Sequence, residues 1–178
     1  MSNLKGKRVL VFIDHEFEDL ETWYPVLRMR EDGIHVDVAA PTGGEKYIGK
    51  YGVPIVSDRA YTDCSADEYD GLYITGGWAP DKMRRVPHVL KLTREMHEAG
   101  KPIGHICHGG WVLVSAKICQ GYTMTSTPGI KDDLENAGAT WIDQEVVVDR
   151  NIVSGRRPPD LPPFTKAFID LLNSGSVQ

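Results

Sequence analysis

The chain lacks most of the features that mark metal, nucleotide and membrane proteins. Its 178 residues include only three cysteines, which form no CxxC pair, and the sequence has neither a P-loop nor a G-x-G-x-x-G fingerprint. Its apolar runs are too short for the core of a signal peptide or for membrane insertion. We therefore expect a cytoplasmic protein with reduced thiols, without a cofactor and without a membrane partner.

The sequence also lacks a cluster of Lys and Arg residues of the kind that binds the phosphates of nucleic acids. The net charge is -5, and Lys and Arg are scattered along the chain rather than gathered in a basic stripe. Hydrophobic residues make up 41% and charged residues 25%, which is typical of globular proteins, and the length suits one core. We expect a single domain over residues 1–178 and no nucleic-acid partner.

Strand and helix patterns alternate along most of the sequence. The apolar run Arg8–Ile13 predicts a strand buried on both faces, and a helix should follow from Asp19 and end at Gly33. Its apolar residues share one helical face, namely Leu20, Trp23, Tyr24 and Leu27. Strands joined by such helices predict an α/β fold with a mostly parallel sheet and helices on both faces.

Later segments repeat this pattern. Further strands are expected at His35–Ala40, Leu72–Thr75 and Ile103–Ile106. Helices are expected over Val89–Ala99, from Gly109, over Ile130–Ala137 and over Phe164–Leu172. Two hairpins complete the pattern, one within Thr42–Asp58 and one formed by Val146–Val148 and Ile152–Ser154.

Cys107 lies where a buried strand pattern meets the next helix. His108, Gly109 and Gly110 follow it at once, so a tight turn would project the sulfur above the carboxyl edge of the sheet. The first amides of the helix would then stabilise a thiolate, the reactive form of cysteine. The alternative is a small cysteine packed in the core.

The same turn also carries residue types that can bind a metal ion. His105, Cys107 and His108 are close in sequence, and Glu16 and Glu18 follow the first strand. The alternation of a strand turns His105 away from the turn, and no second Cys or His cluster completes a ligand set. We therefore expect no metal.

Four segments resemble the PfpI intracellular protease family of the class I glutamine amidotransferase-like superfamily, which also contains the parkinsonism-associated deglycase. They are EFEDLE (16–21), GGWAPD (76–81), HICHGG (105–110) and TPGIKDDLENAGATWIDQEVVVD (127–149). The match runs in order over nearly the whole chain. It implies a flavodoxin-like sandwich and an oligomer with the site near a subunit interface, where Trp78 is a candidate contact.

The resemblance also implies roles for particular residues. Cys107 would be the nucleophile, Glu18 its acidic partner and His108 the general base and acid. Asp81, one methylene shorter than the usual glutamate of the family, would complete the site of a neighbouring subunit. On local pattern alone, Glu18 is a carboxylate at a helix N-terminus and Asp81 a loop or N-cap residue.

Glycines near the turn are candidates for binding substrate and a developing oxyanion. Gly76 and Gly77 follow a predicted strand and could offer amides beside that of His108, and Gly109 follows directly. The alternative is a tight turn without a binding role.

The sequence leaves the substrate open. The thiol could attack a peptide amide, with His108 protonating the leaving amine, or a 2-oxoaldehyde or glycated side chain, with Glu18 moving the proton. A redox-sensing stress protein or chaperone-like protein that uses oxidation of Cys107 is a further hypothesis. Trp111 departs from the family pattern, and Arg156 and Arg157 are either solvated or bind an anionic substrate or a partner subunit.

Overall fold

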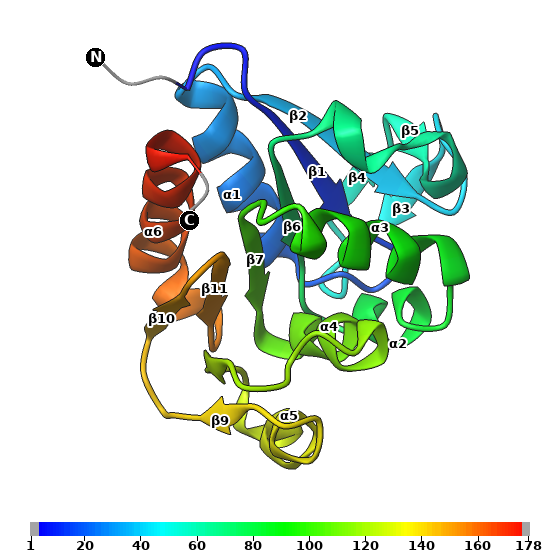
Figure 1. The fold of residues 1–178 in the computed structure, drawn as a ribbon. Coiled ribbons are helices and arrows are strands. Elements are labelled where there is room, and N and C mark those ends of the chain that lie inside the picture. The colour runs from blue at the N-terminus through cyan, green and yellow to red at the C-terminus, as the bar shows by residue number, and fades with distance from the viewer. Residues whose placement is uncertain (1–3, 176–178) are drawn as a thin grey trace.

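The computed structural model describes residues 4–175 and has a seven-stranded central sheet in the order β10-β11-β7-β6-β1-β2-β5 (Figure 1). All neighbouring strands are parallel except β10 and β11, which form the expected antiparallel hairpin. The sheet strands are β1 (Arg8–Phe12), β2 (His35–Ala40), β5 (Arg59–Ala60), β6 (Gly71–Ile74), β7 (Ile103–Ile106), β10 (Val146–Asp149) and β11 (Ile152–Gly155).

Helices cover both faces of this sheet, which confirms the predicted α/β architecture. One face carries α1 and α6, and the other carries α2, α3 and α4, with α5 beyond them (Figure 1). The helices are α1 (Asp19–Glu31), α2 (Ala79–Met83), α3 (Pro87–Glu98), α4 (Gly110–Ala116), α5 (Lys131–Asn136) and α6 (Leu161–Ser174). Among residues 4–175, no helix has the length and apolar character needed to span a bilayer.

The central strands are buried on both sides, as the sequence predicts. Val9, Leu10, Val11 and Phe12 have no exposed surface, because each face of β1 lies under a helical layer. On α3 the expected residues Val89, Leu92 and Met96 are buried. Apolar side chains directed to both faces thus form one continuous core around the sheet.

The face of α1 that packs on the protein differs from the prediction. Leu20, Tyr24 and Leu27 are 59%, 37% and 57% exposed, although their spacing marks them as an apolar stripe. The buried face lies one residue further on and carries Glu21, Thr22, Pro25, Val26 and Met29. This face is buried despite its polar residues because the first turn of α1 lies beside the ends of β1 and β6, where Thr22 Oγ1 and Thr75 Oγ1 are 2.6 Å apart.

Smaller elements lie outside the main sheet. β3 (Lys46–Ile48) and β4 (Pro54–Val56) form the hairpin expected within Thr42–Asp58. The two-residue strands β8 (Thr123–Met124) and β9 (Thr140–Trp141) pair in parallel and were not predicted from the sequence. Five short 3-10 helices complete the described residues, η1 (Tyr61–Asp63), η2 (Ala66–Glu68), η3 (Cys107–Gly109), η4 (Pro128–Ile130) and η5 (Pro158–Asp160).

The order of the strands reverses between β1 and β6. From β1 the chain continues to β2 on one side of the sheet and later to β6 and β7 on the other. Ligands of open α/β sheets bind beyond the carboxyl ends of the strands at such a reversal. The segments that follow β1, β6 and β7 carry the predicted residues Glu18, Gly76, Gly77 and Cys107.

Candidate active site

The site is a cavity of about 220 Å³ at the carboxyl edge of the sheet. Adjacent strands bring its walls together, because β11, β7, β6 and β1 are consecutive neighbours in the sheet. The cavity is lined by Glu18, Glu21, Lys50, Tyr51, Gly77, Trp78, Cys107, His108, Thr127, Arg157 and Pro158. The residues predicted as nucleophile, base and acid therefore share one small space.

Cys107 occupies a strained turn directly after β7. Its φ of 57° lies in the left-handed region, where a residue with a Cβ costs free energy unless the surrounding structure holds it. The turn continues as η3 into α4. The thiol is 8% exposed, so it is reached through the cavity rather than from the open surface. This is the predicted strand-to-helix turn that presents the sulfur.

The electrostatics of the thiol differ from the expected stable thiolate. Burial and the Glu21 carboxyl raise the pKa of Cys107 to about 12, and the amides of His108 and Gly77 only partly oppose this rise. The amide effect has the predicted direction, but loss of hydration outweighs it in this enclosed position. Burial thus favours the thiol over the thiolate, and a proton acceptor beside the sulfur would promote its ionisation.

His108 is placed to receive that proton. Its Nδ1 lies 3.3 Å from Cys107 Sγ. Burial and the Lys50 ammonium lower the pKa of His108 from the ordinary 6.5, so the ring is neutral at pH 7 and can accept a proton. A neutral imidazole with one nitrogen on the thiol is suited to act as a general base.

Two tryptophans hold this imidazole. The ring centroid of His108 lies 5.1 Å from that of Trp78 and 5.0 Å from that of Trp111. Trp111 is fixed in turn, because its Nε1 donates to Asp133 Oδ2 at 2.7 Å and the Arg84 guanidinium lies 5.3 Å from its ring. Trp111 does not line the cavity but supports the side chain that does.

The carboxyl beside the sulfur belongs to Glu21. A methyl group added at Gly76 would collide with Glu21 Oε2 and lie 2.8 Å from Cys107 Cβ, so both side chains converge over that glycine. Glu21 has no exposed surface, and within residues 4–175 neither carboxyl oxygen has a partner with hydrogen-bond geometry. Burial, with the Glu18 carboxylate, raises the pKa of Glu21 to about 8. At neutral pH the group is mostly protonated and can act as an acid.

Glu18 lines the same cavity but has a different local role from the one predicted. It is the N-cap of α1, and its Oε2 accepts a hydrogen bond of 2.7 Å from the amide of Glu21. The helix-terminal alternative therefore describes its geometry, while Glu21, in the first turn of α1, couples to the thiol. Burial raises the pKa of Glu18, and the Glu21 amide opposes this rise.

The three candidate glycines occupy three different positions around the turn. The amides of Gly77 and His108 face the sulfur, where they can bind an oxyanion. Gly77 has a φ of 76° and its α-carbon faces the backbone of Glu16 and Glu18, so no side chain fits there. The amide of Gly76 acts on Glu21 instead. Gly109 packs against β6, where an added methyl would lie 2.8 Å from the Ile74 oxygen.

Asp81 does not reach the site within one chain. It lies on the short helix α2, its side chain is 56% exposed, and it pairs with Arg85 at 3.0 Å. It is not among the residues that line the cavity. Any part of Asp81 in catalysis thus requires a neighbouring subunit.

The histidine before the cysteine is not part of the reactive group. His105 has no exposed surface and its ring lies against Gly110, on the side of the turn away from the cavity. Burial lowers its pKa to about 3. In the described part of the chain, no three His, Cys, Asp or Glu side chains gather as a set that could hold a metal ion.

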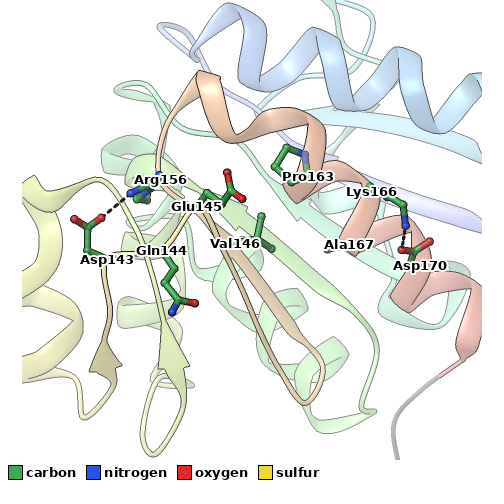
Figure 2. A pocket seen from close by; sticks show the side chains of 9 residues that line it. All are labelled: Asp143, Gln144, Glu145, Val146, Arg156, Pro163, Lys166, Ala167 and Asp170. Atoms are coloured by element: carbon green, nitrogen blue, oxygen red, sulfur yellow. Dashed lines mark hydrogen bonds and ion pairs between the residues drawn. The ribbon is translucent and has the colours of Figure 1, made fainter.

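A larger cavity of about 580 Å³ lies elsewhere, between the start of β10 and α6 (Figure 2). Four of its five charged side chains form ion pairs, Arg156 with Asp143 at 2.8 Å and Lys166 with Asp170. None of its lining residues is a cysteine, serine or histidine. The smaller cavity at Cys107 is therefore the candidate active site.

Sequence reasoning overlooked several residues of this cavity. Glu21 lies within the quoted segment EFEDLE, three residues after Glu18, where an N-cap carboxylate and the next turn of a helix share a face. That spacing could have identified Glu21 as a second candidate. Lys50 and Tyr51 come from the turn of the β3–β4 hairpin, and no local pattern connects them to Cys107.

Comparisons with known proteins identify the family of the chain. Residues 7–171 match the model of the DJ-1/PfpI family. The chain is 41% identical to Deglycase PfpI of Pyrococcus furiosus over 93% of this chain and 99% of that protein. It is 36% identical to Protein/nucleic acid deglycase 2 of Escherichia coli, over 95% and 99% of the two chains. The crystal structure of DJ-1beta from Drosophila melanogaster superposes with a TM-score of 0.88 at 28% identity and covers 97% of this chain and 91% of that one. The chain therefore belongs to the DJ-1/PfpI family.

Proposed function

We propose that this protein is a cysteine-dependent deglycase or glyoxalase that acts on small reactive carbonyl compounds. The observation that carries the proposal is the arrangement of Cys107 between a neutral His108 and a protonated Glu21 in an enclosed cavity. A base on one side of the sulfur and an acid on the other are what addition of a thiol to an aldehyde requires. The names of the deglycase relatives agree with this chemistry.

The reaction can be followed for a 2-oxoaldehyde. His108 Nδ1 takes the thiol proton, the sulfur bonds to the aldehyde carbon, and Glu21 protonates the carbonyl oxygen, which gives a hemithioacetal. A proton then moves from the former aldehyde carbon to the neighbouring carbonyl carbon, and the hydroxyl proton moves to the neighbouring carbonyl oxygen. The first carbon is thereby oxidised to a thioester and the second is reduced to an alcohol. Water hydrolyses the thioester, which releases a 2-hydroxy acid and restores the thiol without an external oxidant.

The amides near the sulfur have a defined part in these steps. Gly77 and His108 direct their N–H groups to the region where negative charge develops during addition and hydrolysis. Fixed donors stabilise such charge more than water does, because they need no reorganisation. Glu18 acts by fixing the first turn of α1, through its hydrogen bond to the Glu21 amide.

Peptide hydrolysis is the second candidate within the same family. His108 beside the sulfur favours it, because an acyl-enzyme mechanism needs a group that protonates the leaving amine. A cavity of about 220 Å³ favours small substrates instead. A chain of peptide residues would need a longer groove, and Asp81 would need a neighbouring subunit to assist. The small-carbonyl reaction needs only groups that one chain supplies.

The redox-sensor hypothesis receives less support from the site. A sensor cysteine is generally an accessible thiolate. Cys107 is 8% exposed, and burial raises its pKa to about 12. Selective oxidation of Cys107 by mild peroxide without turnover of any carbonyl compound would favour the sensor over the enzyme.

Self-association is part of the proposal. The exposed apolar stripe of α1, formed by Leu20, Tyr24 and Leu27, is a surface of the kind that proteins bury between subunits. Trp78 is 44% exposed at the rim of the cavity. A homo-oligomer that buries the stripe would account for the exposure of Leu20, Tyr24 and Leu27 on a helix whose other apolar residues pack into the core.

One experiment separates the two activities. Release of D-lactate from methylglyoxal and cleavage of a fluorogenic peptide are measured side by side, with Cys107→Ser as the control. We expect D-lactate from the native protein and none from the variant. Peptide cleavage without D-lactate would overturn the proposed function.

A further inference from the structure

The turn of the β3–β4 hairpin is fixed over the active-site cavity. The Lys50 amide donates to the Phe17 oxygen at 2.8 Å. Asp19, which is 4% exposed, accepts the amides of Tyr51 and Val53, each at 2.8 Å. A methyl group at Gly49 would meet the Asp19 carboxyl, so the turn lies directly against the start of α1. Lys50 is thus attached to a defined backbone position beside the site.

The Lys50 ammonium lies along the aromatic wall of the cavity. Nζ is 5.3 Å from the centroid of the Tyr51 ring and 5.6 Å from that of Trp78, and both rings line the cavity with Cys107. Such contacts orient a cation but leave its charge available. In residues 4–175 no carboxylate forms an ion pair with Lys50. Its charge opposes the rise that burial causes in the pKa of Glu18 and Glu21. It also adds to the lowering of the pKa of His108, so Lys50 acts on the reactive groups.

Arg157 supplies a second cation from the other side of the sheet's edge, after β11. Its neighbour Arg156 is fully engaged, because it binds Asp143 and Asp160, each at 2.8 Å. Arg157 lines the cavity, and across the described sequence no acidic residue pairs with it. The opposing carboxyls are Glu18 and Glu21, and Glu21 is mostly protonated at neutral pH. Two cationic side chains therefore line the cavity without an ion-pair partner among the described residues.

We propose that Lys50 and Arg157 form a carboxylate-binding subsite beside Cys107, which takes carbonyl substrates that carry a free carboxylate. This substrate class rests on the proposed function. It includes adducts of 2-oxoaldehydes with small thiols or amines that bear a carboxylate. With a thiol adduct, one water is added, the former aldehyde carbon is oxidised, the ketone carbon is reduced, and a 2-hydroxy acid and the free thiol leave. The subsite changes none of these bonds and only holds the carboxylate.

Alkylation of Cys107 tests the subsite without requiring turnover. Iodoacetate carries a carboxylate where iodoacetamide has a neutral amide, so the ratio of their rates at Cys107 reports recognition of the charge. We expect Lys50→Met to lower this ratio about fivefold, as for the loss of one partly exposed charge pair, and Arg157→Val to lower it less. Lys46→Met is the matched control, because this exposed lysine lies in the same hairpin but does not line the cavity. Its ratio should equal that of the native protein.

A catalytic measurement connects the subsite to the substrate. Methylglyoxal adducts of N-acetylcysteine and N-acetylcysteinamide differ only in the carboxylate, and D-lactate release gives kcat/KM for each. The native protein should prefer the carboxylate adduct, and Lys50→Met should lose that preference. An unchanged alkylation ratio in Lys50→Met would overturn the subsite, whatever the lactate assay gives. If the ratio falls as expected but no adduct yields D-lactate, the subsite stands and the proposed function fails.

Discussion

Replacement of Glu21 by glutamine should make the protein more stable while it removes most of the activity. Burial raises the pKa of Glu21 from 4.5 to about 8, so the folded state binds this proton more tightly than the unfolded state does. The free energy of unfolding therefore falls as pH rises between these values. One pH unit corresponds to about 1.4 kcal/mol, which makes the cost about 3 kcal/mol at pH 7.

Glutamine has nearly the same shape as protonated glutamate but does not titrate. The stability gain of Glu21→Gln over the native protein should therefore be small near pH 4.5, about 3 kcal/mol at pH 7 and up to about 5 kcal/mol above pH 8. Loss of a general acid lowers turnover by roughly 10² to 10⁴. The protein would thus retain a destabilising carboxyl because the reaction uses it.

Urea unfolding at several pH values measures this gain, and D-lactate release measures turnover. Glu16→Gln is a suitable control, because Glu16 is exposed at the start of the same segment and its ion pair with Lys82 lowers its pKa. Its variant should gain no stability as pH rises. A stability difference between Glu21→Gln and the native protein that stays constant with pH would refute the reasoning.

Three further predictions follow from the site and the surface. The rate of D-lactate formation should rise with pH as His108 loses its proton below 6.5 and should fall as Glu21 ionises near pH 8. Glu21→Gln should lack the alkaline fall, and a native profile without that fall would contradict the role assigned to Glu21. Trp111→Gln should lower kcat/KM about three- to tenfold, because it removes one ring contact of His108, and Trp111→Phe should restore most of it; equal losses in both variants would argue for a purely structural role. Leu27→Lys should shift the sedimentation of the protein towards the monomer with unchanged circular dichroism, since Leu27 is 57% exposed on the apolar stripe of α1; native sedimentation of this variant would exclude the stripe as the interface.

Much of the fold could be predicted because local patterns and global packing agree. β1 reads as a nearly continuous apolar run because helices cover both its faces. Three helix C-termini could be predicted because a glycine follows each of them. Gly33, Gly100 and Gly138 adopt positive φ values of 84°, 66° and 90°. Such signals are short in range, so one sequence is enough to identify them.

The orientation of α1 could not be predicted in the same way. Its apolar spacing indicates a buried stripe, but the site requires Glu21 and Thr22 to face the sheet, which turns Leu20 and Leu27 outward. Periodicity reports which residues share a face and not which neighbour that face meets. A polar helix face can be buried where its side chains serve a reaction. In α1 this requirement outweighs the usual burial of the apolar face.

The site was predictable at its centre and less so around it. Cys107 follows from a strand, a tight turn and a helix in one segment, whereas the role expected of His108 follows from the family resemblance. The choice between Glu18 and Glu21 depends on side-chain direction at the start of a helix, and the raised pKa of Cys107 depends on how deeply the turn is buried. Lys50 reaches the cavity only through the packing of the β3–β4 turn on Asp19. Distances of this kind come from tertiary structure.

The central claim is that the sulfur of Cys107 bonds covalently to the aldehyde carbon of the substrate. Rapid acid quench of the native protein during turnover of methylglyoxal, followed by mass spectrometry of the peptides, tests it directly, because a covalent intermediate is caught on the cysteine that carries it. The account predicts a mass increase of one methylglyoxal on the peptide that carries Cys107 and none on the peptides that carry Cys64 or Cys119. Turnover by the native protein with no adduct on Cys107 in any quenched sample would contradict it.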